Sequence, residues 1–213
     1  MRAVVDMLVP IKRLGAAKSR LRGAVGARED RGAHAALALA LAMDTVAAAR
    51  SAALVRRLAV VTADPLVAEM VRGEGVEVVR DLPDDGLNPA LRHGAEVLRS
   101  SDPSATVAAL QSDLPALRAS ELDAALAAAV EAGHAFCPDR QGTGTTLLVA
   151  GRGRRWDPRF GPGSALAHAE SGAVALDGPW PSLRCDVDTE ADLRLAARLG
   201  LGPHTRARLV AAS

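Results

Sequence analysis

Two lysines stand six residues apart in a strongly basic stretch near the N-terminus. They are Lys12 and Lys18 in the sequence VPIKRLGAAKSRL, and they are the only lysines among the 26 basic residues of the chain. Lysine is a compact charge on a flexible stem that can settle between phosphate oxygens, whereas arginine is a rigid planar fork. The confinement of lysine to this stretch, which also holds Arg13, Arg20 and Arg22, favours a loop that binds a polyphosphate.

The stretch lacks the two commonest phosphate-binding signatures. Neither GxxxxGK[ST] nor GxGxxG is present, although Gly15 gives the backbone some freedom. A solvated basic turn is the alternative that charge alone leaves open.

Three aspartates follow extended segments and form a second group that could carry chemistry. Asp113 lies in Ser-Asp-Leu-Pro after an apolar run, and Asp186 and Asp188 lie in CDVDTE. In an extended segment, Asp186 and Asp188 point to one face. Magnesium prefers hard oxygen ligands, so the three carboxylates predict a site for one or two Mg²⁺ ions. The alternatives are a turn residue for Asp113 and a helix cap for Asp188.

Two glycine-rich segments form a third group. They are GTGTT at 142–146 and RFGPGS at 159–164. Glycine lets the backbone approach a ligand closely, and Ser164 at the start of a predicted helix could offer a hydroxyl and free N–H groups to an anion. Two ordinary glycine loops and a helix cap are the alternative.

The histidines and cysteines carry no recognisable signature. The five histidines have no metal-ligand spacing, and we expect them at surface or helix positions rather than in catalysis. Cys137 and Cys185 lack a second ligand pair, so we expect two reduced thiols in a cytoplasmic protein.

Composition argues against several classes of partner. The net charge is +1 and aromatic residues make up 2% of the chain, so neither a basic face for duplex DNA nor a stacking platform for single strands is expected. The N-terminus lacks the regions of a signal peptide. The longest apolar helix candidate, around 35–49, contains Asp44 and is judged too short to span a membrane. We therefore expect no nucleic-acid and no membrane partner.

Alternating strands and helices must position the lysine stretch, the aspartates and the glycine-rich segments. Three of the helices have predicted N-caps, which are Asp64, Asn88 and Ser120. The tail after Pro203 is expected to be loosely attached. Strands are predicted at about 3–9, 58–62, 76–79, 105–110, 135–137, 146–150 and 173–176, and helices at about 29–50, 64–73, 88–99, 120–132, 164–170 and 189–199.

This alternation predicts a single α/β domain over residues 1–213. Its sheet should be mixed but mostly parallel, with helices on both faces. Ligands gather at the carboxyl ends of such strands, so we expect most of the loops that follow strands to meet at one crevice. These loops are 10–20, 81–88, 111–115, 142–146 and 184–188.

Taken together and in this order, the motifs resemble a known family. They are VPIKRLGAAKSRL, GLNPAL at 86–91, SDLP at 112–115, GTGTT, FGPGS at 160–164 and DVDT at 186–189. The chain is similar, from residue 1 to about 204, to the phosphoenolpyruvate or 2-phospho-L-lactate guanylyltransferase family of deazaflavin coenzyme F-420 biosynthesis. The lysine loop together with FGPGS is quite specific, whereas DxDT recurs across nucleotidyltransferases of this general fold.

The resemblance implies a Rossmann-like, GT-A-like nucleotidyltransferase fold that moves GMP from GTP onto the phosphate of a three-carbon acid, with Mg²⁺. It also implies a downstream transferase that takes up the unstable product with the deazaflavin precursor. By motif, Asp113, Asp186 and Asp188 would bind metal, and Lys18 and Asp113 would be catalytic. Lys12, Arg13, Lys18 and Arg20 would face the triphosphate with Asn88 near the nucleoside, and Thr146, Gly161 and Ser164 would hold the acid.

Two other functions remain in competition. A nucleotidyltransferase of the same fold could act on a sugar phosphate or a molybdenum cofactor, but that group usually has a more glycine-rich first loop. A non-catalytic nucleotide-binding module would gain nothing from three added carboxylates. The sequence does not choose among phosphoenolpyruvate, 2-phospho-L-lactate and 3-phosphoglycerate, although family resemblance favours phosphoenolpyruvate in an arginine- and alanine-rich bacterial chain.

Overall fold

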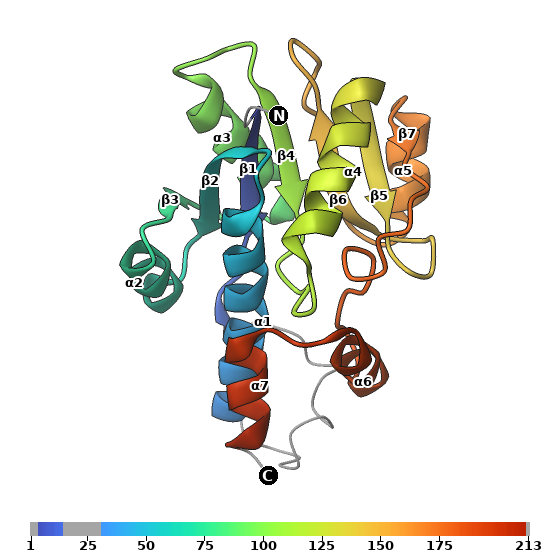
Figure 1. Cartoon of the computed structure of the whole chain (residues 1–213). Helices are drawn as coiled ribbons and strands as arrows, with labels where there is room; N and C mark the ends of the chain where they lie inside the picture. The colour runs from blue at the N-terminus through green and yellow to red at the C-terminus, as the bar shows by residue number, and fades with distance from the viewer. Residues whose placement is uncertain (1–3, 15–30, 212–213) are drawn as a thin grey trace.

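A computed structural model describes residues 4–14 and 31–211, which form one α/β domain around a seven-stranded sheet (Figure 1). The strand order is β3-β2-β1-β4-β6-β5-β7. The strands are β1 (Val5–Pro10), β2 (Val55–Thr62), β3 (Glu77–Arg80), β4 (Thr106–Leu110), β5 (His134–Pro138), β6 (Thr145–Ala150) and β7 (Val174–Ala175).

The predicted sheet, mixed but mostly parallel, is confirmed. β1 pairs in parallel with both β2 and β4, β2 pairs in parallel with β3, and β5 pairs in parallel with β7. Only β6 runs against its neighbours β4 and β5 in the described sheet. The parallel strands β1, β2 and β4 therefore bring their carboxyl ends to the same edge.

Helices cover both faces of the sheet, as the alternation predicts. They are α1 (Arg31–Ser51), α2 (Pro65–Gly73), α3 (Leu87–Arg99), α4 (Ala119–Ala132), α5 (Ser164–Glu170), α6 (Glu190–Leu199) and α7 (Pro203–Val210). On β1, Met7 and Val9 pack into the cluster that holds α1, α2 and α4, while Leu8 packs into the cluster that holds α3 and α5. Side chains alternate between the two faces of a strand, so one apolar strand serves both layers.

One of the three predicted helix caps is confirmed. Asp64 accepts hydrogen bonds from the N–H groups of Leu66 and Val67 at the start of α2, with Pro65 in the first turn. The other two caps are wrong. α3 begins at Leu87 after Gly86, and α4 begins at Ala119 after Arg118.

The tail is anchored, contrary to expectation. Residues Pro203–Val210 form α7, which packs on α1. Buried Asp44 accepts the N–H groups of His204 (2.9 Å) and Thr205 (2.8 Å), so a charge in the apolar helix α1 serves to hold the first turn of α7. A Cβ on Gly202 would lie 2.3 Å from the Asp44 carboxyl carbon, so only glycine fits there.

The judgement that the apolar N-terminal helix is too short to span a membrane is also wrong. Residues Gly32–Ser51 are long and apolar enough by length and composition alone, and 50% of the apolar window is buried inside the domain. The core helix of a globular domain can be equally long and apolar. α1 packs against α7, α4 and β2, as a core helix does.

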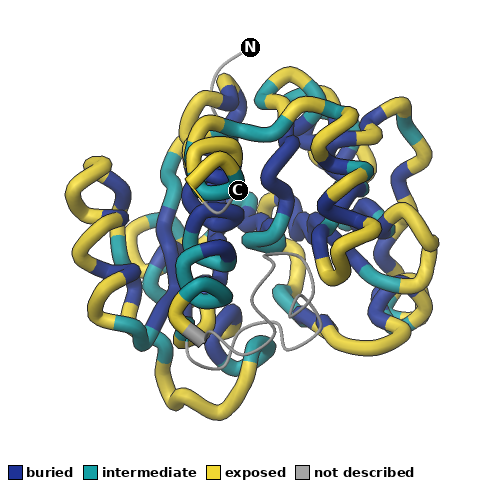
Figure 2. The backbone as a smooth tube through the Cα atoms, turned by 90° about the horizontal axis from the view of Figure 1, so that it is seen from below, coloured by how far each residue is buried: buried dark blue, intermediate teal, exposed yellow. Residues whose placement is uncertain are grey.

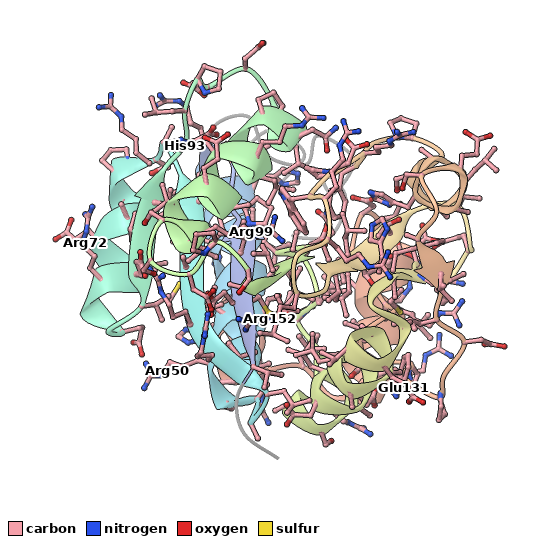
Figure 3. All side chains as sticks on the ribbon, turned by 90° about the horizontal axis from the view of Figure 1, so that it is seen from above. Arg50, Arg72, His93, Arg99, Glu131 and Arg152 are labelled. Carbon is pink, nitrogen blue, oxygen red and sulfur yellow. The ribbon has the colours of Figure 1, made fainter. Side chains whose placement is uncertain are left out.

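The two edges of the sheet differ in character. In Figure 1 the strands β1 and β4 run downward, so their carboxyl ends face the side viewed in Figure 2. Seen from the opposite edge, Figure 3 shows Arg50, Arg72, Arg99 and Glu131 near the carboxyl ends of helices α1 to α4. The amino ends of those helices, which carry partial positive charge, therefore lie toward the edge where the strands end.

Candidate active site

The loop after β4 places Asp113 at the carboxyl edge of the sheet. Its backbone carbonyl accepts the N–H of Val187 at 3.0 Å, which joins this loop to the segment that carries Asp186 and Asp188. From the other side, the Thr45 hydroxyl of α1 accepts the N–H of Leu114 (3.0 Å), and its single hydrogen is shared between the carbonyls of Leu41 (3.0 Å) and Ser112 (3.2 Å). The predicted convergence of the loops at 111–115 and 184–188 is confirmed.

Asp186 shows that the carboxylates influence one another. Burial, followed by the negative charges of Asp113, Asp188 and Asp139, raises the pKa of Asp186 to about 7. Like charges in one place disfavour ionisation unless a cation or hydrogen-bond donors meet them. The structure thus brings the three predicted metal ligands into one electrostatic group and adds Asp139 to it.

Asp188 does not cap the final helix, so this alternative is excluded. Thr189 is the N-cap of α6, and its hydroxyl accepts the N–H of Asp192 at 3.2 Å. The Asp192 carboxylate in turn accepts the N–H of Thr189 at 3.0 Å, which completes a capping box. Arg140 also donates to Asp192 (3.2 Å), which links the segment after β5 to α6.

The carboxylates of Asp113, Asp186 and Asp188 suit a hard cation, although their side chains do not form a complete metal site by themselves. Within residues 4–14 and 31–211, no group of three or more His, Cys, Asp or Glu side chains has the geometry to hold a metal ion. Magnesium usually takes one or two carboxylates and completes its shell with phosphate oxygens and water. Asp113, Asp186 and Asp188 fit this sharing with a substrate better than an all-protein cage.

The glycine-rich segment at 142–146 is held by a buried aspartate. Asp139 accepts the N–H groups of Thr143 (2.9 Å) and Gly144 (2.8 Å). A Cβ on Gly144 would lie 2.4 Å from the Asp139 carboxylate, so glycine is required by this close approach. The Thr143 carbonyl accepts the N–H of Ala165, and the segment is thereby joined to the start of α5.

The three residues predicted to hold the acid lie on these connected segments. Thr146, near the start of β6, is buried and donates to the carbonyl of Cys137 at 3.4 Å. Ser164, the first residue of α5, is buried, and its N–H donates to the carbonyl of Gly161 at 3.1 Å. Gly161 has a φ of 141°, which other residues rarely adopt.

Asn88 is bound to the second glycine-rich segment. Its side chain donates to the carbonyl of Phe160 (2.9 Å) and accepts the N–H of Phe160 (2.8 Å). Because both ends of the amide are used here, the predicted cap role fails. Its predicted place near the nucleoside remains a prediction.

The described part of the lysine loop lies at the same edge. Lys12 and Arg13 follow β1 and are exposed, and Arg13 forms a 3.0 Å ion pair with Asp84. The N–H of Leu14 donates to the second carboxylate oxygen of the α2 cap Asp64 at 2.9 Å. Lys18 and Arg20 lie outside the described residues.

Sequence reasoning missed several positioning residues, of which His168 is the clearest. Of the two expected positions, surface or helix, the helix is confirmed because His168 lies on α5, but its side chain is fully buried beside Thr145 and Phe160. One signal was available. Ser164 and His168 are one helical turn apart and therefore share a face of α5. Asp139 and Thr45 carried no local signal, because their partners lie in loops that only the fold brings near.

Comparison with known proteins identifies relatives over nearly the whole chain. Residues 5–206 match the family described as "Guanylyl transferase CofC like". A phosphoenolpyruvate guanylyltransferase of Salinispora arenicola is 53% identical over 207 residues, covering 96% of this chain and 93% of the relative. One of the same name from Geodermatophilus obscurus is 54% identical over 208 residues, with 96% and 93% covered.

Solved structures share the fold at low sequence identity. A nucleotidyl transferase from Methanothermobacter has a TM-score of 0.56 at 19% identity, covering 92% of this chain and 97% of that one. A 4-diphosphocytidyl-2C-methyl-D-erythritol synthase has a TM-score of 0.59 at 11% identity, covering 93% and 99%. These likenesses confirm the predicted nucleotidyltransferase fold.

Proposed function

This chain belongs to the family of CofC-like guanylyl transferases, and we propose that it transfers GMP from GTP to the phosphate of a phosphorylated three-carbon acid. Phosphoenolpyruvate is the preferred acceptor, because relatives about half identical over almost their full length carry that name. The product belongs to coenzyme F-420 biosynthesis, where a downstream transferase would take it up with the deazaflavin precursor.

The observation that carries this proposal is the 3.0 Å hydrogen bond from the Val187 N–H to the Asp113 carbonyl, which brings Asp113 to the segment of Asp186 and Asp188 at the carboxyl edge. In keeping with this proximity, the charges of Asp113 and Asp188 add to burial in raising the pKa of Asp186. Carboxylates crowded beside a polyphosphate substrate are favourable only with a cation between them. We assign Asp113, Asp186 and Asp188 as the Mg²⁺ ligands. Bound magnesium would supply positive charge that stabilises the transferring phosphoryl group.

The chemistry asks little of the protein beyond positioning. An oxygen of the acceptor phosphate attacks the α-phosphorus of GTP in line, the bond to the bridging oxygen breaks, and pyrophosphate leaves. A phosphate monoester has a second pKa of about 6, so it is ionised at neutral pH and needs no general base. The obstacle is repulsion between two polyanions, which positive charge fixed at the site reduces.

Two groups of residues divide this task. Lys12, Arg13, Lys18 and Arg20 neutralise the triphosphate, with Lys18 and Asp113 closest to the reaction. Thr146, Gly161 and Ser164 hold the acid, on segments that Asp139 and Asn88 hold in place and that the bond from the Ala165 N–H to the Thr143 carbonyl joins. We propose that Asn88 serves mainly to hold Phe160 in place. Binding of the nucleoside by Asn88 is the alternative role.

A substrate panel tests the proposal. Purified protein is given GTP and Mg²⁺ with phosphoenolpyruvate, 2-phospho-L-lactate or 3-phosphoglycerate, and pyrophosphate release is scored. We expect release with GTP and a phosphorylated acid together, and less with CTP, ATP or UTP. Asp113→Asn should remove it with the fold intact. Release with a sugar phosphate instead would favour the runner-up transferase, and no release with any acceptor would favour a binding module.

We also propose that the protein acts in the cytoplasm. Cys137 and Cys185 are free thiols and both are buried. Burial raises the pKa of each thiol to about 11, which keeps both protonated and unreactive. Cell fractionation of a producing strain tests the location directly.

A further inference from the structure

A buried histidine joins the segments on which we place the acceptor acid. The Nδ1 atom of His168 lies 2.9 Å from the Thr145 hydroxyl, next to Thr146 on β6. Its Nε2 atom accepts the backbone N–H of Arg159 at 3.0 Å, next to Phe160. His168 itself lies on α5, one turn from Ser164. One imidazole therefore bridges β6, the segment before FGPGS and the helix that follows it.

The hydrogen bonds determine which tautomer is present. A backbone N–H can only donate, so Nε2 must carry a lone pair and the proton must reside on Nδ1. The Nδ1–H donates a hydrogen bond to the Thr145 hydroxyl oxygen, which keeps its own hydrogen for another partner. A protonated imidazole would place a second donor against the Arg159 N–H and would break this bridge.

The surroundings keep the ring neutral. Burial, followed by the positive charges of His134 and Arg159, lowers the pKa of His168 to about 4, against an opposing effect of Asp157. Phe160 meets the ring edge-on at a centroid distance of 5.1 Å, and Phe136 lies at 5.8 Å. At neutral pH the side chain is therefore an uncharged hydrogen-bonding bridge in an aromatic setting.

Two independent bonds hold adjacent peptide groups of one segment. His168 accepts the N–H of Arg159, and Asn88 accepts the N–H of Phe160. Gly161 and Ser164 follow directly, so their positions depend on both anchors. A substrate site built from backbone and small side chains has little else to define its shape, and small displacements of such a site cost large factors in rate.

We propose that neutral His168 is a positioning residue for the acceptor acid, acting through Arg159 and Thr145 on the residues that bind it. This inference rests on the proposed function, because it assumes that Thr146, Gly161 and Ser164 contact the acid. Because the His168 side chain is fully buried, we expect it not to contact GTP. Its loss should therefore affect the acid and not the nucleotide.

A pair of variants of similar polarity tests the assignment. In His168→Gln the amide oxygen reaches the place of Nε2 and can accept the Arg159 N–H. In His168→Asn the shorter amide reaches only the place of Nδ1 and leaves that N–H without its acceptor. We expect Asn to raise KM for the acid about tenfold or more, Gln to raise it by less than about threefold, and KM for GTP to change by less than about twofold in both.

Hydrogen exchange supplies a second readout that does not need turnover. The amide of Arg159 should exchange at least about tenfold faster in the Asn variant than in the Gln variant. His204→Gln is the matched control, because His204 lies on α7 and should change neither readout. Thermal unfolding is recorded for every variant to exclude global loss of structure.

The outcomes separate this inference from the proposed function. An active wild-type enzyme whose Asn and Gln variants share the same KM for the acid would overturn the positioning role. Equal rises in KM for the acid and for GTP would overturn it as well, because they indicate a general structural effect. A wild-type protein that transfers no GMP to any acid would instead refute the proposed function, while the exchange measurement would still test the Arg159 contact.

Discussion

Asn88 and Phe160, 72 residues apart in the chain, exchange two hydrogen bonds. The Asn88 amide donates to the Phe160 carbonyl at 2.9 Å and accepts its N–H at 2.8 Å. A single primary amide thus satisfies both polar groups of one peptide residue, and the first turn of α3 is fastened to the FGPGS segment. Neither a carboxylate nor an alkyl side chain can satisfy both partners.

Replacing Asn88 should separate its two candidate roles. Asn88→Ala leaves a backbone donor and acceptor unmet and should lower the free energy of unfolding by about 1–3 kcal/mol. Asn88→Asp should be similarly harmful, because a carboxylate oxygen would face the Phe160 carbonyl. We expect KM for the acid to rise and KM for GTP to stay within about twofold in steady-state assays. The reverse pattern would place Asn88 at the nucleoside instead.

Asp186 should make the metal-free protein less stable as the pH rises. Its pKa is raised to about 7, so the stability linked to the protonated form is complete below about pH 4 and is lost between about pH 4 and pH 7. Asp186→Asn removes this dependence and should stabilise the metal-free protein by about 2–4 kcal/mol at pH 8, relative to wild type.

Urea unfolding at pH 5 and pH 8, with a chelator present, measures this difference. The matched control is Asp177→Asn, since Asp177 is fully exposed and should show no such gain. Adding Mg²⁺ and GTP should stabilise the wild type more than the Asn variant. If both gain equally, Asp186 does not bind the metal.

The two lysines should not be replaceable by arginine. Lys12 is exposed, so Lys12→Ala and Lys12→Arg should both leave the unfolding temperature nearly unchanged. We expect kcat/KM for GTP to fall at least tenfold on Lys12→Ala or Lys18→Ala, and arginine at either position to recover only part of it. Full recovery of kcat/KM by arginine would show that positive charge alone is needed. It would contradict the argument that this loop uses lysine because of the shape of its side chain.

The hydrogen bonds between Asp44 and the first turn of α7 should protect α7 from proteolysis. Asp44→Ala removes the acceptor for the N–H groups of His204 and Thr205 and should cost about 2 kcal/mol. Asp44→Asn keeps one acceptor oxygen and should cost about half as much.

Limited trypsin digestion reads this out, since Arg206 and Arg208 lie within α7. Cleavage there should speed up in the Ala variant before the rest of the domain is cut. Equal digestion of wild type and Ala variant would mean that α7 is held by its apolar contacts and not by Asp44.

The sequence by itself determined the features that depend on local chemistry. Alternating apolar strands and helices predicted the sheet, Asp64 and Pro65 predicted the start of α2, and Ser164–Glu170 was placed as a helix. The convergence of Asp113 with the 184–188 segment was also expected from sequence, because both were placed after extended segments of a mostly parallel sheet. In the structure Asp113 follows β4, whereas 184–188 is not part of a strand.

Only the tertiary structure decided what depends on a distant partner. Asn88 was predicted as a helix cap, and Asp44 was an acid in an apolar helix candidate. In the structure Asn88 binds Phe160 and Asp44 binds α7, more than 70 residues away in each case. In the sequence, His168 is not distinguished from other helix positions. Its role follows from its contacts with Thr145 on β6 and with Arg159, which only the fold brings near. Local pattern limits which bonds a side chain can make, whereas the packing of remote segments selects the bond that is formed.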